Sequence, residues 1–148
     1  MTNLEQQTWL QLYCKEAKQC KLLDIAELEP EWAMESDFQT WCEGKRELTI
    51  EDVSGRVWVK SCPAGYITEV HFHLDGTLNE YRLFDRFETS GRWNLNSGLL
   101  EVAIEKGENQ YRFAVVANRS ENIHSAIEYK NGELHSYLKL VQVEAMTR

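Results

Sequence analysis

The sequence predicts a mostly β protein: an eight-stranded antiparallel barrel of up-and-down order, preceded by one or two helices. Three observations support this fold class. From Leu48 onward apolar residues recur with a period of two, turn signals interrupt these runs at regular intervals, and the residues before 46 show helical spacing instead. Because 148 residues is close to the commonest domain size, we expect a single domain over 1–148, with a helical segment at 1–46 and the barrel at 47–143.

Two helical stretches are expected in the amino-terminal segment. An amphipathic helix at about 3–20 is predicted by the spacing of Trp9, Leu12, Tyr13, Ala17 and Cys20. A second helical stretch follows between Pro30, which suits a first helical position, and Gly44, which suits the position after a helix end. Ser36 could instead cap a shorter helix, which would split this stretch in two.

The rest of the chain divides into eight short runs of alternating character. We expect strands at about 56–61, 66–74, 77–84, 89–95, 99–105, 109–117, 122–130 and 133–142. The turn signals between them are Pro63-Ala64-Gly65, Asp75-Gly76, Asn96-Ser97-Gly98, Lys106-Gly107, the polar stretch 118–122 and Asn131-Gly132. Consecutive antiparallel strands of this kind hide their edges by closing into a barrel.

Three of the turns also predict which side chains face the interior. If Asp75-Gly76, Lys106-Gly107 and Asn131-Gly132 are two-residue turns, each fixes the register of one strand pair. The predicted partners are Phe72 with Asn79, Val70 with Tyr81, Leu100 with Phe113, Val102 with Tyr111, Tyr129 with Leu134 and Ser125 with Leu138. Each turn then places apolar partners on one face, and His71 lies opposite Glu80 on the other.

The predicted interior also contains polar groups. They are Thr68, Asn79, Tyr81, Trp93, Asn109, Tyr111, Ser125, Tyr129 and Ser136. Buried polar groups cost free energy without partners, so these residues indicate either a ligand-holding cavity or a filled core whose hydroxyl groups bond to one another or to water. In a ligand site the tyrosines and Trp93 would form the apolar wall, while Asn79 and Ser125 would orient polar atoms.

Residues 66–142 carry a series of short motifs. These are Phe72-His73-Leu74-Asp75-Gly76-Thr77, then Gly91-Arg92-Trp93, then Leu99-Leu100-Glu101-Val102, then Tyr111. In this order the segment resembles the small bacterial lipocalin-like (calycin-type) β-barrel domains, which implies a barrel fold. Two features depart from lipocalins proper, because the first strand reads Gly55-Arg56-Val57-Trp58 in place of Gly-x-Trp and the last strand lacks their late arginine. No ligand follows from the resemblance, since pockets diverge on one scaffold.

Charge and composition exclude several classes of function. The net charge is −8 and the longest basic run is Lys45-Arg46, so we expect no nucleic-acid partner and repulsion from anionic membrane surfaces. No apolar run of about 18 residues predicts a membrane span, and the first residues lack the pattern of a signal peptide, so we expect a cytoplasmic protein. Free thiols are expected at the widely spaced Cys14, Cys20, Cys42 and Cys62.

The four histidines do not form a predicted catalytic or metal site. His71 and His73 alternate on one strand and could share a metal with Glu69 or Glu80, but the predicted register places them on a charged outer face. His124 and His135 are also expected on the polar face of the last hairpin. No nucleophile or nucleotide motif is present, so we assign no catalytic residue and no cofactor.

The sequence therefore favours a non-enzymatic binding module that holds a small, partly apolar ligand in the barrel. The alternative is an interaction or structural protein with a filled barrel, which binds a protein partner or a second copy through its helices or an open sheet edge. An enzyme that uses the cavity, such as an isomerase or hydrolase, ranks last because no acid–base pair is predicted inside.

Overall fold

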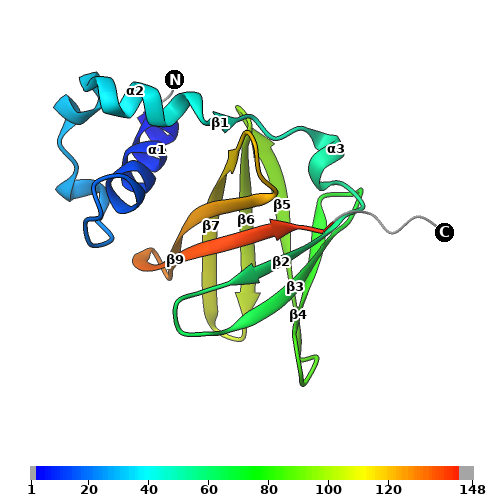
Figure 1. The fold of residues 1–148 in the computed structure, drawn as a ribbon. Coiled ribbons are helices and arrows are strands. Elements are labelled where there is room, and N and C mark those ends of the chain that lie inside the picture. Colours follow the sequence, from blue (N-terminus) through cyan, green and yellow to red (C-terminus); the bar gives the residue numbers. More distant parts are fainter. Residues whose placement is uncertain (1–2, 144–148) are drawn as a thin grey trace.

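The structure, a computed structural model that describes residues 3–143, confirms the predicted fold class (Figure 1). Eight antiparallel strands form a closed barrel of up-and-down order. They are β2 (Val57–Ser61), β3 (Ile67–Phe72), β4 (Thr77–Arg82), β5 (Glu88–Asn96), β6 (Leu99–Lys106), β7 (Asn109–Asn118), β8 (Ile123–Lys130) and β9 (Glu133–Gln142). The pairing of β2 with β9, in which Val59 lies opposite Val141, closes the ring. No strand of the eight is left as an open edge, as closure requires.

Large apolar side chains fill one half of the barrel. The indole of Trp58 is fully buried and meets the ring of Phe72 edge to face, with ring centroids 5.6 Å apart. The same core contains Val70, Leu78, Trp93, Leu100, Val102, Phe113, Val115, Leu138 and Leu140. Burial of one such side chain stabilises the fold by roughly 1.5–3 kcal/mol, so this half supplies much of the barrel's stability.

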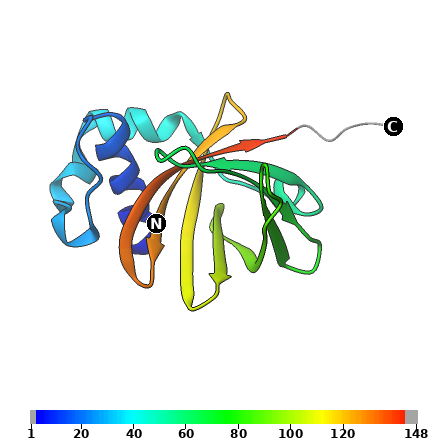
Figure 2. The same cartoon turned by 90° about the horizontal axis from the view of Figure 1, so that it is seen from below.

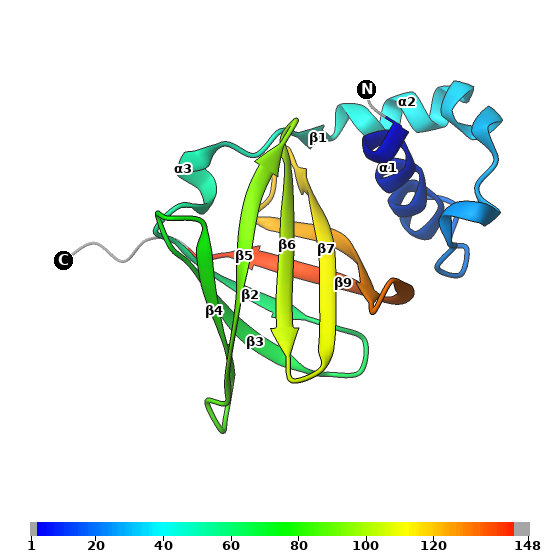
Figure 3. The ribbon, with the colours of Figure 1, turned by 180° about the vertical axis from the view of Figure 1, so that it is seen from behind.

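The amino-terminal helices lie together against one side of the barrel, as Figures 2 and 3 show. They are α1 (Asn3–Glu16), the 3₁₀ helices η1 (Ile25–Glu27) and η2 (Pro30–Met34), and α2 (Ser36–Glu43). The second predicted stretch is thus split before Ser36, the alternative that the sequence left open. Leu12 of α1 is fully buried against Val116 and Ile127 on the outer face of the sheet. None of the helices within residues 3–143 is long and apolar enough to cross a membrane.

Two short elements were not predicted. Strand β1 (Lys45–Arg46) pairs with the end of β7, and helix α3 (Ile50–Val53) covers the end of the barrel where β2 begins (Figure 1). A capping box holds α3, because Thr49 and Asp52 each accept from the backbone of the other. Elements of two and four residues are too short to show a hydrophobic period, which explains why the sequence pattern missed them.

The register of the β3–β4 hairpin differs from the prediction. Val70 lies opposite Glu80 and Phe72 opposite Leu78, so the predicted partners Tyr81 and Asn79 are wrong. The turn holds three residues rather than two, and Gly76 adopts a φ of +89° that a side chain rarely allows. A shift of one residue reverses the faces of β4, so Glu80 points into the barrel.

The other two hairpins whose register was predicted each differ in part from the prediction. In β6–β7 the register is displaced by two residues, with Val102 opposite Phe113, so the predicted faces survive although the partners are wrong. In β8–β9 the pair Tyr129–Leu134 is confirmed, but a bulge follows between Glu128 and Tyr129. The extra residue is His135 of β9, so Leu138 keeps its predicted inward face but pairs with Ala126 instead of Ser125, and the predicted faces of β8 are reversed along the whole strand.

Candidate ligand site at the open end of the barrel

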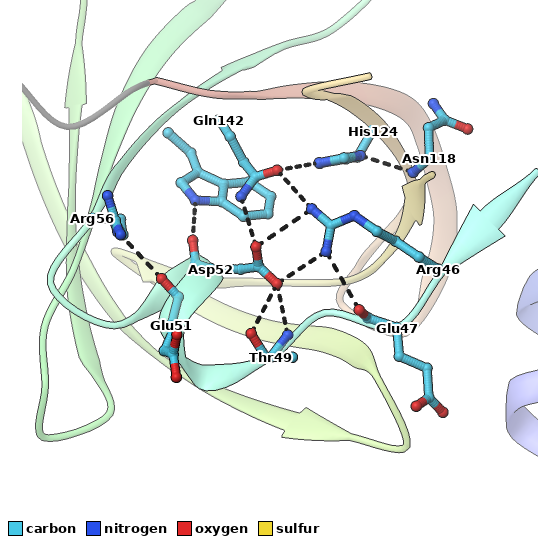
Figure 4. Close-up of polar contacts among 10 residues, drawn as sticks. Arg46, Glu47, Thr49, Glu51, Asp52, Arg56, Asn118, His124 and Gln142 are labelled. Atoms are coloured by element: carbon cyan, nitrogen blue, oxygen red, sulfur yellow. Dashed lines mark hydrogen bonds and ion pairs between the residues drawn. The ribbon is translucent and has the colours of Figure 1, made fainter. Parts of the chain in front are cut away.

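A polar cluster lies beneath α3 at one end of the barrel, which we call the closed end (Figure 4). The guanidinium of Arg46 donates to both carboxylate oxygens of Asp52, at 3.0 and 3.4 Å, and to Oε1 of Gln142 at 3.2 Å. Burial acts to raise the pKa of Asp52, but the hydrogen bonds from Arg46 and the Thr49 backbone outweigh it and lower the pKa to about 2. The cluster ties the segment before β2 to the last strand.

His124 takes part in the same cluster and faces into the barrel, which corrects its predicted place on the outer face. The imidazole is fully buried against Trp58, and its Nδ1 accepts from the backbone N–H of Asn118 at 2.9 Å. Nε2 therefore carries the proton and donates to Oε1 of Gln142 at 2.7 Å. Burial lowers the pKa of His124, and a second proton would meet the Asn118 donor, so the ring is held neutral.

The opposite end, which we call the open end, contains a cavity of about 420 Å³. Four hairpin turns surround it, at 62–66, 83–87, 107–108 and 131–132. Inward-facing side chains of six strands form its walls: Lys60, Thr68, Glu80, Ile104, Glu128 and Leu138. The cavity thus reaches into the barrel interior, and the apolar core of the other half forms its floor.

A buried ion pair occupies one wall of the cavity. Nζ of Lys60 lies 2.5 Å from Oε2 of Glu80, and the hydroxyl groups of Thr68 and Thr89 donate to the same carboxylate at 2.7 and 3.1 Å. Burial acts to raise the pKa of Glu80, but the charge of Lys60 and these donors outweigh it and lower the pKa below its ordinary value. Glu80 is therefore an ionised carboxylate whose partners all belong to the protein.

Glu128 lies in a different environment. Its side chain is only 8% exposed, and within residues 3–143 its ion-pair distance to a basic side chain is the 3.9 Å to Nε2 of His135. No hydrogen-bond donor of the described residues reaches its carboxyl group. Burial raises the pKa of Glu128 above its ordinary value, against the lowering effect of Lys60 and His135. The cavity thus contains two carboxyl groups with opposite pKa shifts.

Tyr111 forms an aromatic wall near the mouth of the cavity. The ammonium groups of Lys106 and Lys130 lie over its ring at 5.5 and 5.7 Å from the centroid, and the ring of His135 meets its edge at 5.9 Å. Within the described part of the chain, neither lysine forms an ion pair with a carboxylate. The mouth therefore presents two cations beside one aromatic ring.

Apolar side chains stand exposed on two of the turns that surround the mouth. We call the turns at 62–66 and 83–87 the rim. Tyr66 lines the cavity although it is 68% exposed, and Phe84 is 93% exposed at the tip of the β4–β5 hairpin. This hairpin extends beyond the neighbouring turns (Figures 1 and 3).

The structure brings only part of the predicted site together. Thr68 and Tyr111 line the cavity, whereas Trp93 lies in the filled half and donates from Nε1 to the carbonyl oxygen of His73. The register shift places Asn79 and Tyr81 on the outer face of β4 instead of inside. Ser125 and Tyr129 also point outward, beneath α1, where Gln11 donates to the hydroxyl of Tyr129.

The candidate histidine pair lies outside the barrel. Nε2 of His71 contacts Glu69 at 3.2 Å, and Nε2 of His73 contacts Oδ1 of Asn79 at 2.7 Å, so the two rings have separate partners. Among residues 3–143 no group of three or more His, Cys, Asp or Glu side chains is arranged to hold a metal ion.

Sequence reasoning missed Lys60, Glu80 and Glu128. A three-residue turn at Leu74-Asp75-Gly76 would have revealed Glu80, because glycine at the third position is typical of such turns. The register of β8 against β7 places Glu128 opposite the inward-facing Phe113, and the longer polar connection at 118–122 gives no comparable signal of that register. Comparison with known proteins adds no further residues, since no family model, curated protein or solved structure matches the chain.

Proposed function

We propose that the protein is a binding module that holds a small, partly apolar molecule in the open end of its barrel. The observation that carries the proposal is the cavity of about 420 Å³, which falls in the size range of small-molecule sites. Ile104, Leu138 and Tyr111 provide apolar walls, and a few polar groups converge between them. Ligand sites in proteins combine these two kinds of surface.

The arrangement of the barrel agrees with this proposal. The apolar core fills the half of the barrel next to α3, whereas the cavity of the other half is lined by inward-facing side chains and opens at the far end. The likeness of residues 66–142 to lipocalin-like barrels supports the same function, because those barrels hold ligands in their interiors. We propose the assignment to the lipocalin-like barrels together with this function.

The two alternatives receive less support. Trp9 and Trp41 of the helices pack on each other and on the barrel, with ring centroids 6.0 Å apart, so they do not form a free docking surface. The ring closure leaves no open edge among β2–β9 for a partner strand. The cavity does contain the carboxyl groups that an enzyme would need, but Glu80 is fully engaged by Lys60 and two threonines.

A thermal-shift screen against fatty acids, tetrapyrroles and flavins tests the proposal. A ligand at about 100 times its dissociation constant should stabilise the fold by ~2.7 kcal/mol. Cys62→Trp, which fills the mouth of the cavity, should abolish the shift. Ser61→Trp is the matched control, since the neighbouring residue on the strand points away from the cavity.

The screen has a clear negative result. If no compound raises the melting temperature, or if Cys62→Trp leaves every shift unchanged, the open end is not a ligand site. The interaction-protein alternative would then be favoured.

A further inference from the structure

Glu128 is the one buried group in the cavity that the fold does not explain. Its side chain is more than nine-tenths buried, yet its carboxyl group accepts no hydrogen bond from the described residues. Within the described residues its oxygens face the cavity rather than a protein donor, and a carboxyl group so placed is costly to ionise, so such a group is unusual unless it serves a site. Glu80, on the facing side of the same cavity, shows that this barrel can fully satisfy a carboxylate.

The charges around the cavity show which kind of ligand fits beside Glu128. The lining contains the cations Lys60, Arg82, Lys106 and Lys130, against the carboxyl groups Glu80 and Glu128. Glu80 neutralises Lys60, and Asp85 pairs with Arg82 at 2.9 Å outside the cavity. Lys106 and Lys130 remain against the single carboxyl group of Glu128, so the lining keeps an excess of positive charge in a chain whose net charge is −8. This local field attracts an anion and repels a cation.

We infer that the site takes an organic anion and binds it together with one proton on Glu128. The inference rests on the proposed function and names the chemical class of its ligand. The acidic group of the ligand lies between Lys106, Lys130 and the carboxyl group of Glu128, and its apolar body lies against Tyr111, Ile104 and Leu138. Protonated Glu128 donates a hydrogen bond to the anion, whereas ionised Glu128 would repel it.

A cationic ligand fits this geometry less well. An ammonium group beside ionised Glu128 would gain one opposite charge, but it would approach Lys106 and Lys130, which are unpaired within the described residues, at the same time. The two ligand classes also predict opposite responses to pH. Cation binding strengthens as Glu128 loses its proton, whereas anion binding weakens.

The pH response follows from the groups that surround Glu128. Lys60 on β2, Lys106 on β6 and His135 on β9 favour its ionised form, whereas burial and Glu80 on β4 favour its protonated form. A bound anion adds a second negative charge and favours the protonated form further. Affinity for an anion is therefore highest below the pKa that Glu128 has in the free protein, and it falls as pH rises above that value.

Three eight-carbon probes with different head groups test the inference by isothermal titration calorimetry. Octane-1-sulfonate stays anionic and octylammonium stays cationic over the pH range, while octan-1-ol is neutral. At about pH 5.5 we expect octane-1-sulfonate to bind at least about tenfold more tightly than the other two. At about pH 8.5 its affinity should fall about tenfold, and titrations in two buffers of different ionisation enthalpy should show proton uptake on binding.

Variants test which residues cause the preference for octane-1-sulfonate and its dependence on pH. Glu128→Gln keeps a hydrogen-bond donor and the side-chain volume, so it should bind octane-1-sulfonate at both pH values without proton uptake. Lys106→Met with Lys130→Met should weaken octane-1-sulfonate about tenfold and leave octan-1-ol within about threefold. Lys15→Met with Lys21→Met removes the same charge from the helical segment and is the matched control.

Each outcome decides the question. Preferential binding of octylammonium or octan-1-ol would overturn the inference but support the proposed function. Wild-type pH dependence in Glu128→Gln would also overturn it, because the proton would then reside elsewhere. Failure of all three probes to bind would count against both the inference and the proposed function, which the separate ligand screen then tests alone.

Discussion

At the scale of single residues, the barrel interior shows how strongly the surroundings of a carboxyl group change its pKa. Glu80 and Glu128 are both buried in the same cavity, but only Glu80 has an ammonium partner and two hydroxyl donors. The pKa of Glu80 is lowered and that of Glu128 is raised, each by the balance of burial against nearby donors and charges. The two residues should therefore respond in opposite ways to removal of their charge.

Glu128→Gln should stabilise the protein at neutral pH. A raised pKa in the folded state means that the contribution of Glu128 to stability is most favourable below its ordinary pKa of 4.5 and is lost as pH rises through the folded pKa. The variant avoids this loss, so at pH 7 its free energy of unfolding should exceed that of the wild type by ~1 kcal/mol, which raises the melting temperature by about 4 °C. Near pH 4 the two melting temperatures should be equal. Glu80→Gln should instead lower stability by about 2–3 kcal/mol, because Lys60 would remain buried without its partner. Equal melting temperatures for the wild type and Glu128→Gln at pH 7 would contradict this account.

Asp52 should contribute to acid sensitivity at the closed end. Its pKa is lowered from 3.8 to about 2, so the stability that it provides is complete above pH 4 and is lost as pH falls toward 2. Asp52→Asn should cost about 1–2 kcal/mol at pH 7, measured by urea unfolding, and the two curves should converge near pH 2. Glu51→Gln, which changes an exposed carboxylate on the same helix, should have no such effect.

At the scale of elements, the close contact between β5 and β6 depends on a residue without a side chain. A Cβ atom at Gly91 would lie 2.1 Å from the carbonyl oxygen of Ala103, so the two strands would have to move apart. Gly91→Ala should lower the free energy of unfolding by about 2–3 kcal/mol. Gly44→Ala is the control, because its nearest atom would be 3.4 Å away. If Gly91→Ala lowered the free energy of unfolding no more than Gly44→Ala does, the two strands would be able to move apart at little cost.

The attachment of α1 to the barrel depends on Leu12. This side chain is fully buried against β7 and β8, so Leu12→Ala should cost about 2–4 kcal/mol through lost burial and a residual cavity. Leu74→Ala, at a position 84% exposed, makes the same chemical change and should cost less than about 0.5 kcal/mol. Chemical denaturation of both variants would check the difference.

The strands were predictable as elements, but their exact pairing was not. Alternation and turn residues located all eight strands, because both signals come from neighbours along the chain. Register depends on one residue more or less in a turn, and the bulge beside Glu128 inserts one extra residue, His135, into β9. Tyr111 kept its predicted face because an error of two residues preserves the alternation, whereas Tyr81 lost it through an error of one.

At the scale of the whole molecule, the barrel class was readable from sequence, but the division between its two ends was not. Thr68 was correctly placed inside, but its partner Glu80 was assigned to the outer face, so the polar cavity was predicted around the wrong side chains. Charged side chains on a strand normally face water, and here Lys60, Glu80 and Glu128 are the exceptions. Such exceptions mark the site, since a core alone would not require them.

The filled, covered end of the barrel has a kinetic consequence for any occupant of the cavity. A molecule held there must arrive and depart through the same opening, past Tyr66 and the hairpin that ends in Phe84. A substitution at Phe84 that obstructs this passage without touching the bound molecule would slow capture and release by the same factor, and the equilibrium occupancy would stay constant. The lifetime of the complex therefore depends on the hairpin that ends in Phe84, whereas the affinity depends on the side chains that line the cavity.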